Sequence, residues 1–282
     1  METIITKEQV AQTVRDAIPH LACELPVDVR NALERAAETE TSLRGGEVLR
    51  QLCVNARIAE RDQVPICQDT GTVWICLEIG PDVMVAGDVF ADVNRAVGAA
   101  YSDARLRKSL VRNAVHDRTN TGDNTPAFCE IHPVAEPGAA RLGIMLKGGG
   151  SDNASRVTML VPGAGKQGII DELLDCIHRK AANACPPLVI GIGIGTTFDK
   201  VSGLAKRALM RPIGAAAPNP QDEALERELL SLVNSTGIGP GALGGSTTAL
   251  AVKVNSGPCH IAALPLAINM GCSAMRRATY DL

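Results

Sequence analysis

Aromatic side chains and basic clusters are scarce in this sequence of 282 residues, which has one Trp, two Tyr and three Phe. The formal net charge is −3 at pH 7, and no block of Lys and Arg occurs. Proteins that bind nucleic acid need a basic surface, and those that bind single strands stack bases on aromatic rings. The composition therefore argues against nucleic acid as a partner. Because 45% of the residues are hydrophobic, the core must consist mainly of Ala, Val, Ile and Leu.

Long apolar runs are also missing. No segment approaches the roughly 18 consecutive apolar residues of a membrane-spanning helix. The N-terminal sequence METIITKEQV lacks the basic segment followed by an apolar one that is typical of a secretory signal. We therefore expect a cytoplasmic protein that has no membrane partner.

Paired metal-binding motifs are absent as well. The sequence has no C-x-x-C pair, which argues against a zinc ribbon and against a ferredoxin-type cluster. Nine cysteines are nevertheless present, and their odd number and wide scatter are unlike the disulfide framework of a small secreted domain. We expect reduced thiols, of which a subset serves as ligands. Four others are expected to be small buried hydrophobic residues: Cys23, Cys53, Cys76 and Cys176.

The apolar pattern predicts an α/β fold with mixed β-sheets flanked by helices and a helix-rich N-terminal region. We expect a single domain over residues 1–282, with a helical part over about 1–62 and an α/β part over about 63–282. Strands are expected near 73–79, 142–147, 188–194 and 249–254, and helices over 169–184, 197–209 and 220–234.

Three local signals refine this prediction. Thr6 and Gln9 have the spacing of a capping box at the start of the first helix. Asp88 is expected to cap a helix that carries Val89 and Val93. Alternating residues over 128–147 suggest a hairpin.

The segment Cys67–Thr72, CQDTGT, offers the densest chemistry in the chain. It contains a thiol, an amide, a carboxylate and two hydroxyls in six consecutive residues, and it is poor material for a core or a helix. Such a segment can bring a thiolate and a carboxylate to one small site. Our interpretation is that Cys67 binds iron and that Asp69 handles a proton.

Two further segments look functional. Residues 104–127 are polar and rich in turn formers, and a long loop in a compact domain is usually functional or disordered. Its arginines and amides suit a wall that binds carboxylates. Gly148–Gly150 follow an expected strand and can expose backbone N–H groups to an anion. The glycines at 191–195 and 163–165 fit neither a dinucleotide fingerprint nor a phosphate loop.

Three cysteines stand apart by their context, because each follows or ends an expected element beside Gly or Pro. They are Cys67, Cys185 before Pro186, and Cys272 after Gly271. Cys259 is a rival for the third position. Spacing alone does not decide whether the three converge.

Seven motifs in register over roughly residues 45–276 resemble the class I fumarate hydratases, which are iron–sulfur hydro-lyases. These motifs are CQDTGT (67–72), LRKS (106–109), NTGDNTPA (120–127), KGGGS (147–151), ACPP (184–187), IGPGALGGSTTALAVKV (238–254) and GCSAMR (271–276). Family members built as one chain continue into a second domain, which is missing from this sequence. The chain is therefore similar to the alpha subunit of a two-subunit enzyme.

The resemblance implies a [4Fe-4S] cluster bound by Cys67, Cys185 and Cys272, with one iron left open as a Lewis acid. The match to GCSAMR favours Cys272 over Cys259. Asp69 takes the role of the acid. Gln68 and Arg107 match contacts to a substrate carboxylate, and Gly149 matches a backbone contact.

The family's base is a threonine in the part that this chain lacks. The resemblance thus implies a partner beta subunit in alpha–beta pairs, and inactivity of the chain alone. Asp123, Asn124 and Ser246–Thr248 are expected to support the site without taking part in the chemistry.

The implied function is the reversible hydration of a small dicarboxylate, fumarate, to malate. Two alternatives stay open. One is the alpha subunit of the related tartrate dehydratase, which uses the same cluster with a different hydroxy-acid pocket. The other is an iron–sulfur electron carrier or sensor without catalytic activity, which would have four protein ligands.

Overall fold

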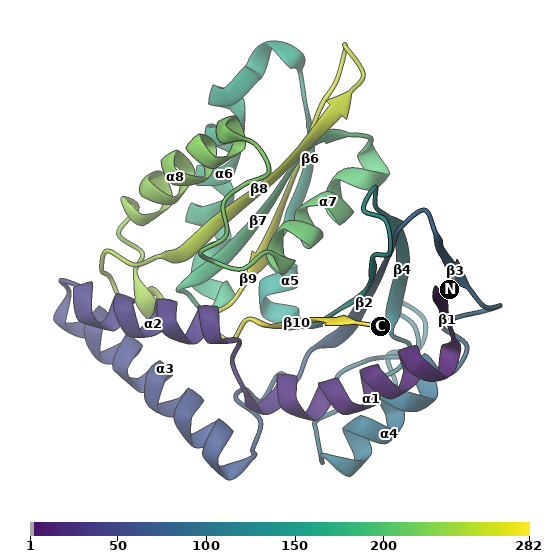
Figure 1. The fold of residues 1–282 in the computed structure, drawn as a ribbon. Helices are drawn as coiled ribbons and strands as arrows, with labels where there is room; N and C mark the ends of the chain where they lie inside the picture. The colour runs from purple at the N-terminus through teal and green to yellow at the C-terminus, as the bar shows by residue number, and fades with distance from the viewer. Residues whose placement is uncertain (1–2) are drawn as a thin grey trace. The chain divides into compact units, whose positions relative to one another are not determined.

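A computed structural model describes residues 3–282, which divide into two units (Figure 1). Unit 1 consists of the segment that ends at Pro26, of Ile58–Gly149 and of Arg276–Leu282. Unit 2 consists of Val27–Arg57 and Gly150–Met275. The third helix, α3 (Leu43–Asp62), and the short helix α5 (Gly149–Asn153) contain residues of both units.

Unit 1 is built on a four-stranded sheet with the order β10-β5-β2-β4. The two central strands are antiparallel to each other, whereas β4 runs parallel to β2. The strands are β2 (Thr72–Ile79), β4 (Phe128–Pro133), β5 (Ala140–Lys147) and β10 (Arg276–Asp281). Helices α1 (Lys7–Cys23) and α4 (Val93–Asp103) pack on each other and share a core with β2 and β5. Two short strands, β1 (Thr3–Ile5) and β3 (Val83–Val85), pair in parallel beside them.

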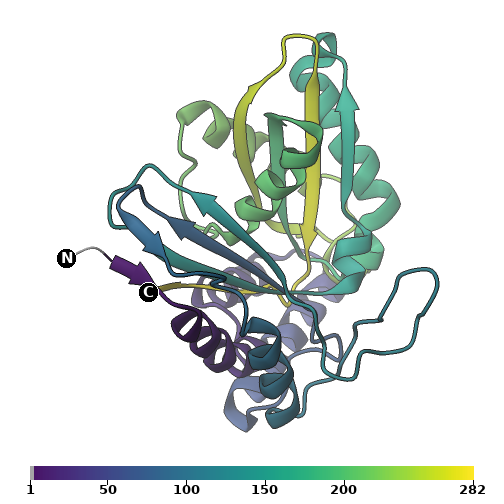
Figure 2. The same cartoon turned by 90° about the vertical axis from the view of Figure 1, so that its right-hand side faces the viewer.

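Unit 2 is built on a second sheet with the order β6-β9-β7-β8. Its strands are β6 (Arg156–Leu160), β7 (Leu188–Thr196), β8 (Ala249–Cys259) and β9 (Leu264–Gly271). The loop that joins β8 to β9, yellow at the top of Figure 2, passes the end of β7, because β7 lies between these strands. Helix α2 (Val27–Thr39) also belongs to this unit.

Helices cover both faces of the unit 2 sheet, and the alternation of side chains along β7 explains how. Leu188, Ile190 and Ile192 point into a core shared with α6 (Gly165–Lys180) and α8 (Pro220–Asn234). The residues between them, Gly191 and Gly193, face α7 (Phe198–Met210) on the other side. Because these two positions have no side chain, the backbone of α7 can lie directly on the strand.

Most of the predicted elements are confirmed. The fold is α/β, α1 to α3 form the helix-rich N-terminal region, and β2, β5, β7 and β8 include the expected strands. The capping box at Thr6 and Gln9 is present. Helix α6 ends at Lys180 and continues as a 3-10 turn, η2 (Ala181–Ala184), up to Cys185. Residues 104–127 contain no helix and no strand, only an isolated bridge between Val111 and Asn120.

Two local predictions were wrong. Residues 128–147 do not form a hairpin, because β4 and β5 pair with opposite edges of β2. Asp88 does not cap α4, which begins four residues after the expected start, at Val93. The Asp88 carboxylate instead accepts a hydrogen bond from the N–H of Phe90 in the preceding turn, at 3.2 Å.

No helix among residues 3–282 has the length and apolar character needed to cross a membrane.

The close contact between β7 and α7 gives a test of this fold. A Cβ atom at position 193 would lie 2.4 Å from the carbonyl oxygen of Val201 and 2.8 Å from the nitrogen of Ala205. We therefore expect Gly193→Ala to lower the free energy of unfolding by about 1–3 kcal/mol, because the helix must move away from the strand. Urea unfolding monitored by circular dichroism measures this change.

Gly203→Ala is the matched control, because Gly203 lies on α7, the helix that packs against Gly193. A Cβ at position 203 meets only the flexible guanidinium end of Arg207, at 3.4 Å. Since Ala favours a helix more than Gly does, this variant should be as stable as the wild type or up to about 1 kcal/mol more stable. Equal unfolding curves for both variants would contradict the packing described here.

Candidate functional site

Asp69 lies in unit 1, on the irregular segment between α3 and β2. One carboxylate oxygen, Oδ1, accepts a hydrogen bond from the N–H of Gly71 at 3.0 Å, which makes a local turn. The other, Oδ2, accepts from the N–H of Gly149 at 2.8 Å. Gly149 belongs to the glycine run after β5, so an internal carboxylate already occupies this backbone donor. These two bonds fix the orientation of the Asp69 side chain.

Buried side chains hold the backbone of the same segment. The hydroxyl of Tyr101 donates to the carbonyl oxygens of Thr70 and Gly71, at 3.0 and 3.1 Å. The amide of Asn124 donates to the Gly71 carbonyl at 3.1 Å and accepts from the N–H of Ser109 at 2.8 Å. Asn124 is completely buried and has a φ of +63°. The motif NTGDNTPA thus supports CQDTGT, as the sequence predicts.

Tyr101 stays protonated in this role. Burial raises the pKa of its hydroxyl to about 12, although the nearby Arg276 cation opposes the rise. A neutral phenol keeps its proton and so remains a donor to both carbonyl groups.

The loop that carries Arg107 is tied to the same segment. The hydroxyl of Thr70 donates to the carbonyl oxygen of Arg107, and the side chain of Asn120 donates to that of Lys108 at 2.9 Å. The side chains of Arg107 and Gln68 are both exposed. The thiol of Cys67 contacts the Gln68 amide oxygen at 3.3 Å and accepts from the N–H of Asp69 at 3.4 Å. Unit 1 therefore places Cys67, Gln68, Asp69, Gly149 and the backbone of Arg107 around one segment.

Unit 2 brings Cys185 and Cys272 to the same end of its sheet, where β7 begins and β9 ends. Cys185 follows the 3-10 turn after α6 in a left-handed conformation, with φ 56° and ψ 66°. Its carbonyl oxygen accepts a hydrogen bond from the N–H of Ser273 at 3.0 Å. This bond joins the two loops just before β7 begins and just after β9 ends.

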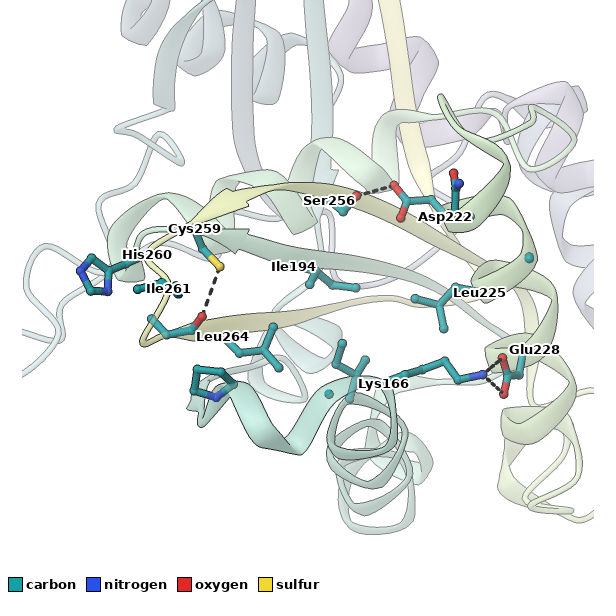
Figure 3. Close-up of a pocket in the computed structure, with 16 residues that line it drawn as sticks. Lys166, Ile194, Asp222, Leu225, Glu228, Ser256, Cys259, His260, Ile261 and Leu264 are labelled. Carbon is teal, nitrogen blue, oxygen red and sulfur yellow. Dashed lines mark hydrogen bonds and ion pairs between the residues drawn. The ribbon is translucent and has the colours of Figure 1, made fainter.

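Cys259, the rival for the third position, lies at the opposite end of the sheet. It pairs with Thr196 at the far end of β7, whose nine residues span about 26 Å. Its thiol donates to the carbonyl oxygen of Ala263 at 3.2 Å. Figure 3 shows this contact at one end of a mostly apolar cavity of about 720 Å³ between the strands and helices α6 and α8. The ion pair of Lys166 with Glu228, at 2.9 Å, lies at the other end.

The glycine-rich loop 237–248 of unit 2 is held by Glu40, which follows α2. The carboxylate of Glu40 accepts hydrogen bonds from the N–H groups of Ser42, Ser246 and Thr247 at 2.9–3.0 Å, and from the Ser246 hydroxyl at 3.0 Å. Burial opposes ionisation of Glu40, but these hydrogen bonds outweigh it and lower its pKa to about 2. The loop in turn donates from Gly241 to the carbonyl of Pro186, next to Cys185, at 2.9 Å.

The donor chemistry fits an iron–sulfur cluster. Cys67, Cys185 and Cys272 are exposed or half-buried, whereas Cys23, Cys53, Cys76 and Cys176 are buried as predicted. Burial raises the pKa of three of these four thiols, Cys23, Cys53 and Cys176, so they are poor ligands. No three His, Cys, Asp or Glu side chains in the described part of the chain are placed to hold a metal ion.

Three residues that support the candidate site were not predicted from the sequence: Tyr101, Glu40 and Arg276. Arg276 is buried and its Nη2 donates to the carbonyl oxygen of Asp69 at 2.8 Å. The sequence held a signal for two of them. Tyr101 is one of only two tyrosines, and Arg276 is the last residue of the GCSAMR motif. No local signal distinguishes Glu40 from the acidic residues of the preceding helix, α2.

Comparison with known proteins gives one family and a consistent set of relatives. The family model described as fumarate hydratase matches residues 11–281. A Methanocaldococcus jannaschii protein, provisionally named L(+)-tartrate dehydratase subunit alpha, is 37% identical over 96% of each chain. The L(+)-tartrate dehydratase subunit alpha of Escherichia coli K12 is 30% identical over 96% of this chain and 90% of its own.

Removing the charge of Glu40 should destabilise unit 2 in a pH-dependent way. The pKa of Glu40 is lower in the folded chain than in the unfolded chain, so its stabilising contribution is complete above roughly pH 5 and is lost as the pH falls toward 2. We expect Glu40→Gln to lower the free energy of unfolding at pH 7 by about 1–3 kcal/mol. The difference from the wild type should shrink between pH 5 and pH 3, as measured by urea unfolding at each pH.

Glu38→Gln is the control, because Glu38 is an exposed carboxylate two residues before Glu40, near the end of α2. It should change the free energy of unfolding by less than about 0.5 kcal/mol at either pH. A Glu40→Gln difference that stays constant over this pH range would refute the role of the carboxylate charge.

Proposed function

The chain belongs to the fumarate hydratase family and is a hydro-lyase subunit, and from this premise we propose that it is the alpha subunit of an iron–sulfur enzyme that hydrates fumarate reversibly to malate. The observation that carries the proposal is the family match, which extends over residues 11–281. The arrangement of unit 1 supports it, because a carboxylate fixed in place stands beside a thiol and near the backbone of an exposed arginine.

Dehydration of tartrate is the second candidate. The M. jannaschii and E. coli relatives are both named as tartrate dehydratase alpha subunits. Tartrate differs from malate by one additional hydroxyl, so the reaction type and the need for an acid and a base are the same. The choice between them depends on which groups contact that hydroxyl.

We assign the metal ligands to Cys67, Cys185 and Cys272. When bound there, a [4Fe-4S] cluster supplies a Lewis acid for an oxygen of the substrate. The hydrogen bond between the loops of Cys185 and Cys272 supports this set. Cys259 lies at the other end of the sheet, which argues against it as the third ligand.

Asp69 protonates the departing hydroxyl in the dehydration direction and takes that proton back in the hydration direction. Its two hydrogen bonds hold the carboxyl group in one orientation, which favours proton transfer to a bound substrate. The exposed guanidinium of Arg107 binds a substrate carboxylate through paired N–H groups, and the amide of Gln68 adds a donor. A substrate contact at Gly149 must replace its bond to Asp69.

A beta subunit completes the site. Both relatives carry the word alpha in their names, which supports a two-subunit enzyme. The base that removes the carbon-bound proton belongs to that partner, so the alpha chain alone is inactive. We expect this pair to work in the cytoplasm.

One experiment decides between the substrates. The chain is reconstituted anaerobically with iron and sulfide, combined with its partner subunit, and assayed with malate, fumarate and both enantiomers of tartrate. Turnover of malate and fumarate at a higher kcat/KM than of either tartrate supports the fumarase assignment. The reverse order would transfer the chain to tartrate dehydration, and no turnover of any of these acids would refute the proposed reaction.

Asp69→Asn tests the acid. The amide keeps the shape and one of the two oxygens that accept hydrogen bonds, but it cannot deliver a proton to the hydroxyl. We expect kcat to fall roughly 100- to 10,000-fold, while the iron and sulfide contents stay at the wild-type level. Steady-state kinetics and metal analysis of the complex measure both.

Asp123→Asn is the matched control for this substitution. One oxygen of the Asp123 carboxylate accepts hydrogen bonds from the N–H and the hydroxyl of Thr125, which an amide oxygen can also do. Its kcat should stay within a few-fold of the wild type. Unchanged turnover in Asp69→Asn would remove Asp69 from proton transfer.

The ligand assignment has its own test. Cys272→Ser should bind less iron and sulfide after reconstitution, because a hydroxyl is a poor ligand for this cluster. Cys259→Ser should load like the wild type. The opposite pattern, read from iron content and the visible absorption of the cluster, would make Cys259 the third ligand.

A further inference from the structure

Arg276 is the first residue of β10 and is almost completely buried, at 1% exposure. It pairs with Leu146 on β5, the strand that leads to Gly148 and Gly149. One end of its guanidinium, Nη2, donates to the carbonyl oxygen of Asp69 at 2.8 Å. The residue therefore fixes the main chain of Asp69, while Gly71 and Gly149 fix its side chain.

The rest of this guanidinium is unsatisfied. Nε and Nη1 are buried and have no hydrogen-bond partner within residues 3–282. Buried arginines are normally paired with an acid or fully hydrogen-bonded, because an unpaired buried cation is strongly destabilising. Arg276 thus has two donor nitrogens that the rest of the described chain does not use.

Unit 2 shows the usual arrangement for comparison. Its buried Glu226 accepts from Arg211 at 2.6 Å and lies 3.7 Å from the ammonium group of Lys253. Its buried Asp222 accepts from the hydroxyl of Ser256 at 2.7 Å. The unsatisfied donors of Arg276 are therefore a feature of its own position.

The acid nearest to Arg276 is Asp69, but its two carboxylate oxygens accept backbone N–H groups, and neither Nε nor Nη1 of Arg276 is bonded to them. The thiol of Cys67 lies on the same segment. The peptide N–H of Asp69 donates to the sulfur of Cys67 at 3.4 Å, and the carbonyl of Asp69 accepts from Arg276. Cys272 precedes Arg276 by four residues in the sequence. A cluster bound by these thiolates would be anionic, and within unit 1 only the Asp69 peptide separates the Cys67 sulfur from the Arg276 guanidinium.

Burial distinguishes such a resident anion from a substrate. The donors of Arg276 have no contact with solvent, which suits a group that stays in place. Arg107 is exposed, which suits a carboxylate that exchanges with solvent at every turnover.

We propose that Arg276 is a positioning residue that holds Asp69 by its carbonyl and supplies the counter-charge for the iron–sulfur cluster. This inference depends on the function proposed above. It predicts that the guanidinium destabilises the cluster-free chain and stabilises the loaded one, which a residue with a merely structural role does not do.

The test compares the full-length wild-type chain with Arg276→Met and Arg276→Lys, each with and without anaerobic reconstitution. Without the cluster, Arg276→Met should melt at the same temperature as the wild type or higher, because the unpaired cation is gone. After reconstitution it should gain less thermal stability than the wild type. It should also lose iron to a chelator about 10- to 100-fold faster. Arg276→Lys keeps the charge and should fall between the two.

Arg277→Gln is the matched control, since it removes a second buried guanidinium from the next position of the same strand. Its rate of iron loss should equal that of the wild type. Equal iron retention in Arg276→Met and the wild type would overturn the inference and leave the proposed function intact. An equal drop in melting temperature with and without the cluster would also overturn it. If the wild type takes up no iron, the proposed cofactor and this inference both fail.

Discussion

The hydrogen bonds that hold residues 69–71 of unit 1 are the constraint on which the candidate site depends. This segment has neither a helix nor a sheet to satisfy its peptide groups, yet buried peptide groups must be paired. Tyr101, Asn124 and Arg276 provide the donors, and each is almost completely buried. The carboxylate of Asp69 has a fixed orientation only because these three side chains hydrogen-bond to the backbone of residues 69–71.

Unit 2 solves the same problem with a different group. Its glycine-rich loop presents a series of N–H donors, and Glu40 receives two of them on its carboxylate. Asn234 accepts from Thr248 and Ala249 in the same way. An internal carboxylate therefore occupies the donors of this loop. Gly149 is a parallel case in unit 1, since its N–H is taken by Asp69.

Local pattern was enough to predict the regular elements, because periodicity, caps and prolines act over a few residues. It failed where a distant partner decides. The strands β4 and β5 are neighbours in sequence, but β2 lies between them in the sheet, and no signal within 128–147 reveals this. The same holds for the supports of the site: Arg276 and Asp69 are 207 residues apart, and Glu40 and Ser246 are 206 apart.

The candidate site residues were named from motifs, and the structure explains why motifs could carry that information. CQDTGT, NTGDNTPA and GCSAMR contain the groups that bond to one another in unit 1, so each motif preserves one side of a shared contact. Tyr101 and Glu40 lie outside the motifs and were missed for that reason. A motif identifies residues that make a contact, but a single sequence does not identify the residues that they contact.

Burial separates the residues of unit 1 into two groups with different tasks. Tyr101, Asn124 and Arg276 are inaccessible and act on the backbone, whereas Gln68 and Arg107 are exposed and can meet a ligand. A ligand that arrives from solvent can reach only the second group. On the function proposed above, the framework would set the position of the acid and the exposed groups would select the substrate, so enzymes that share the framework could act on dicarboxylates that differ by one hydroxyl.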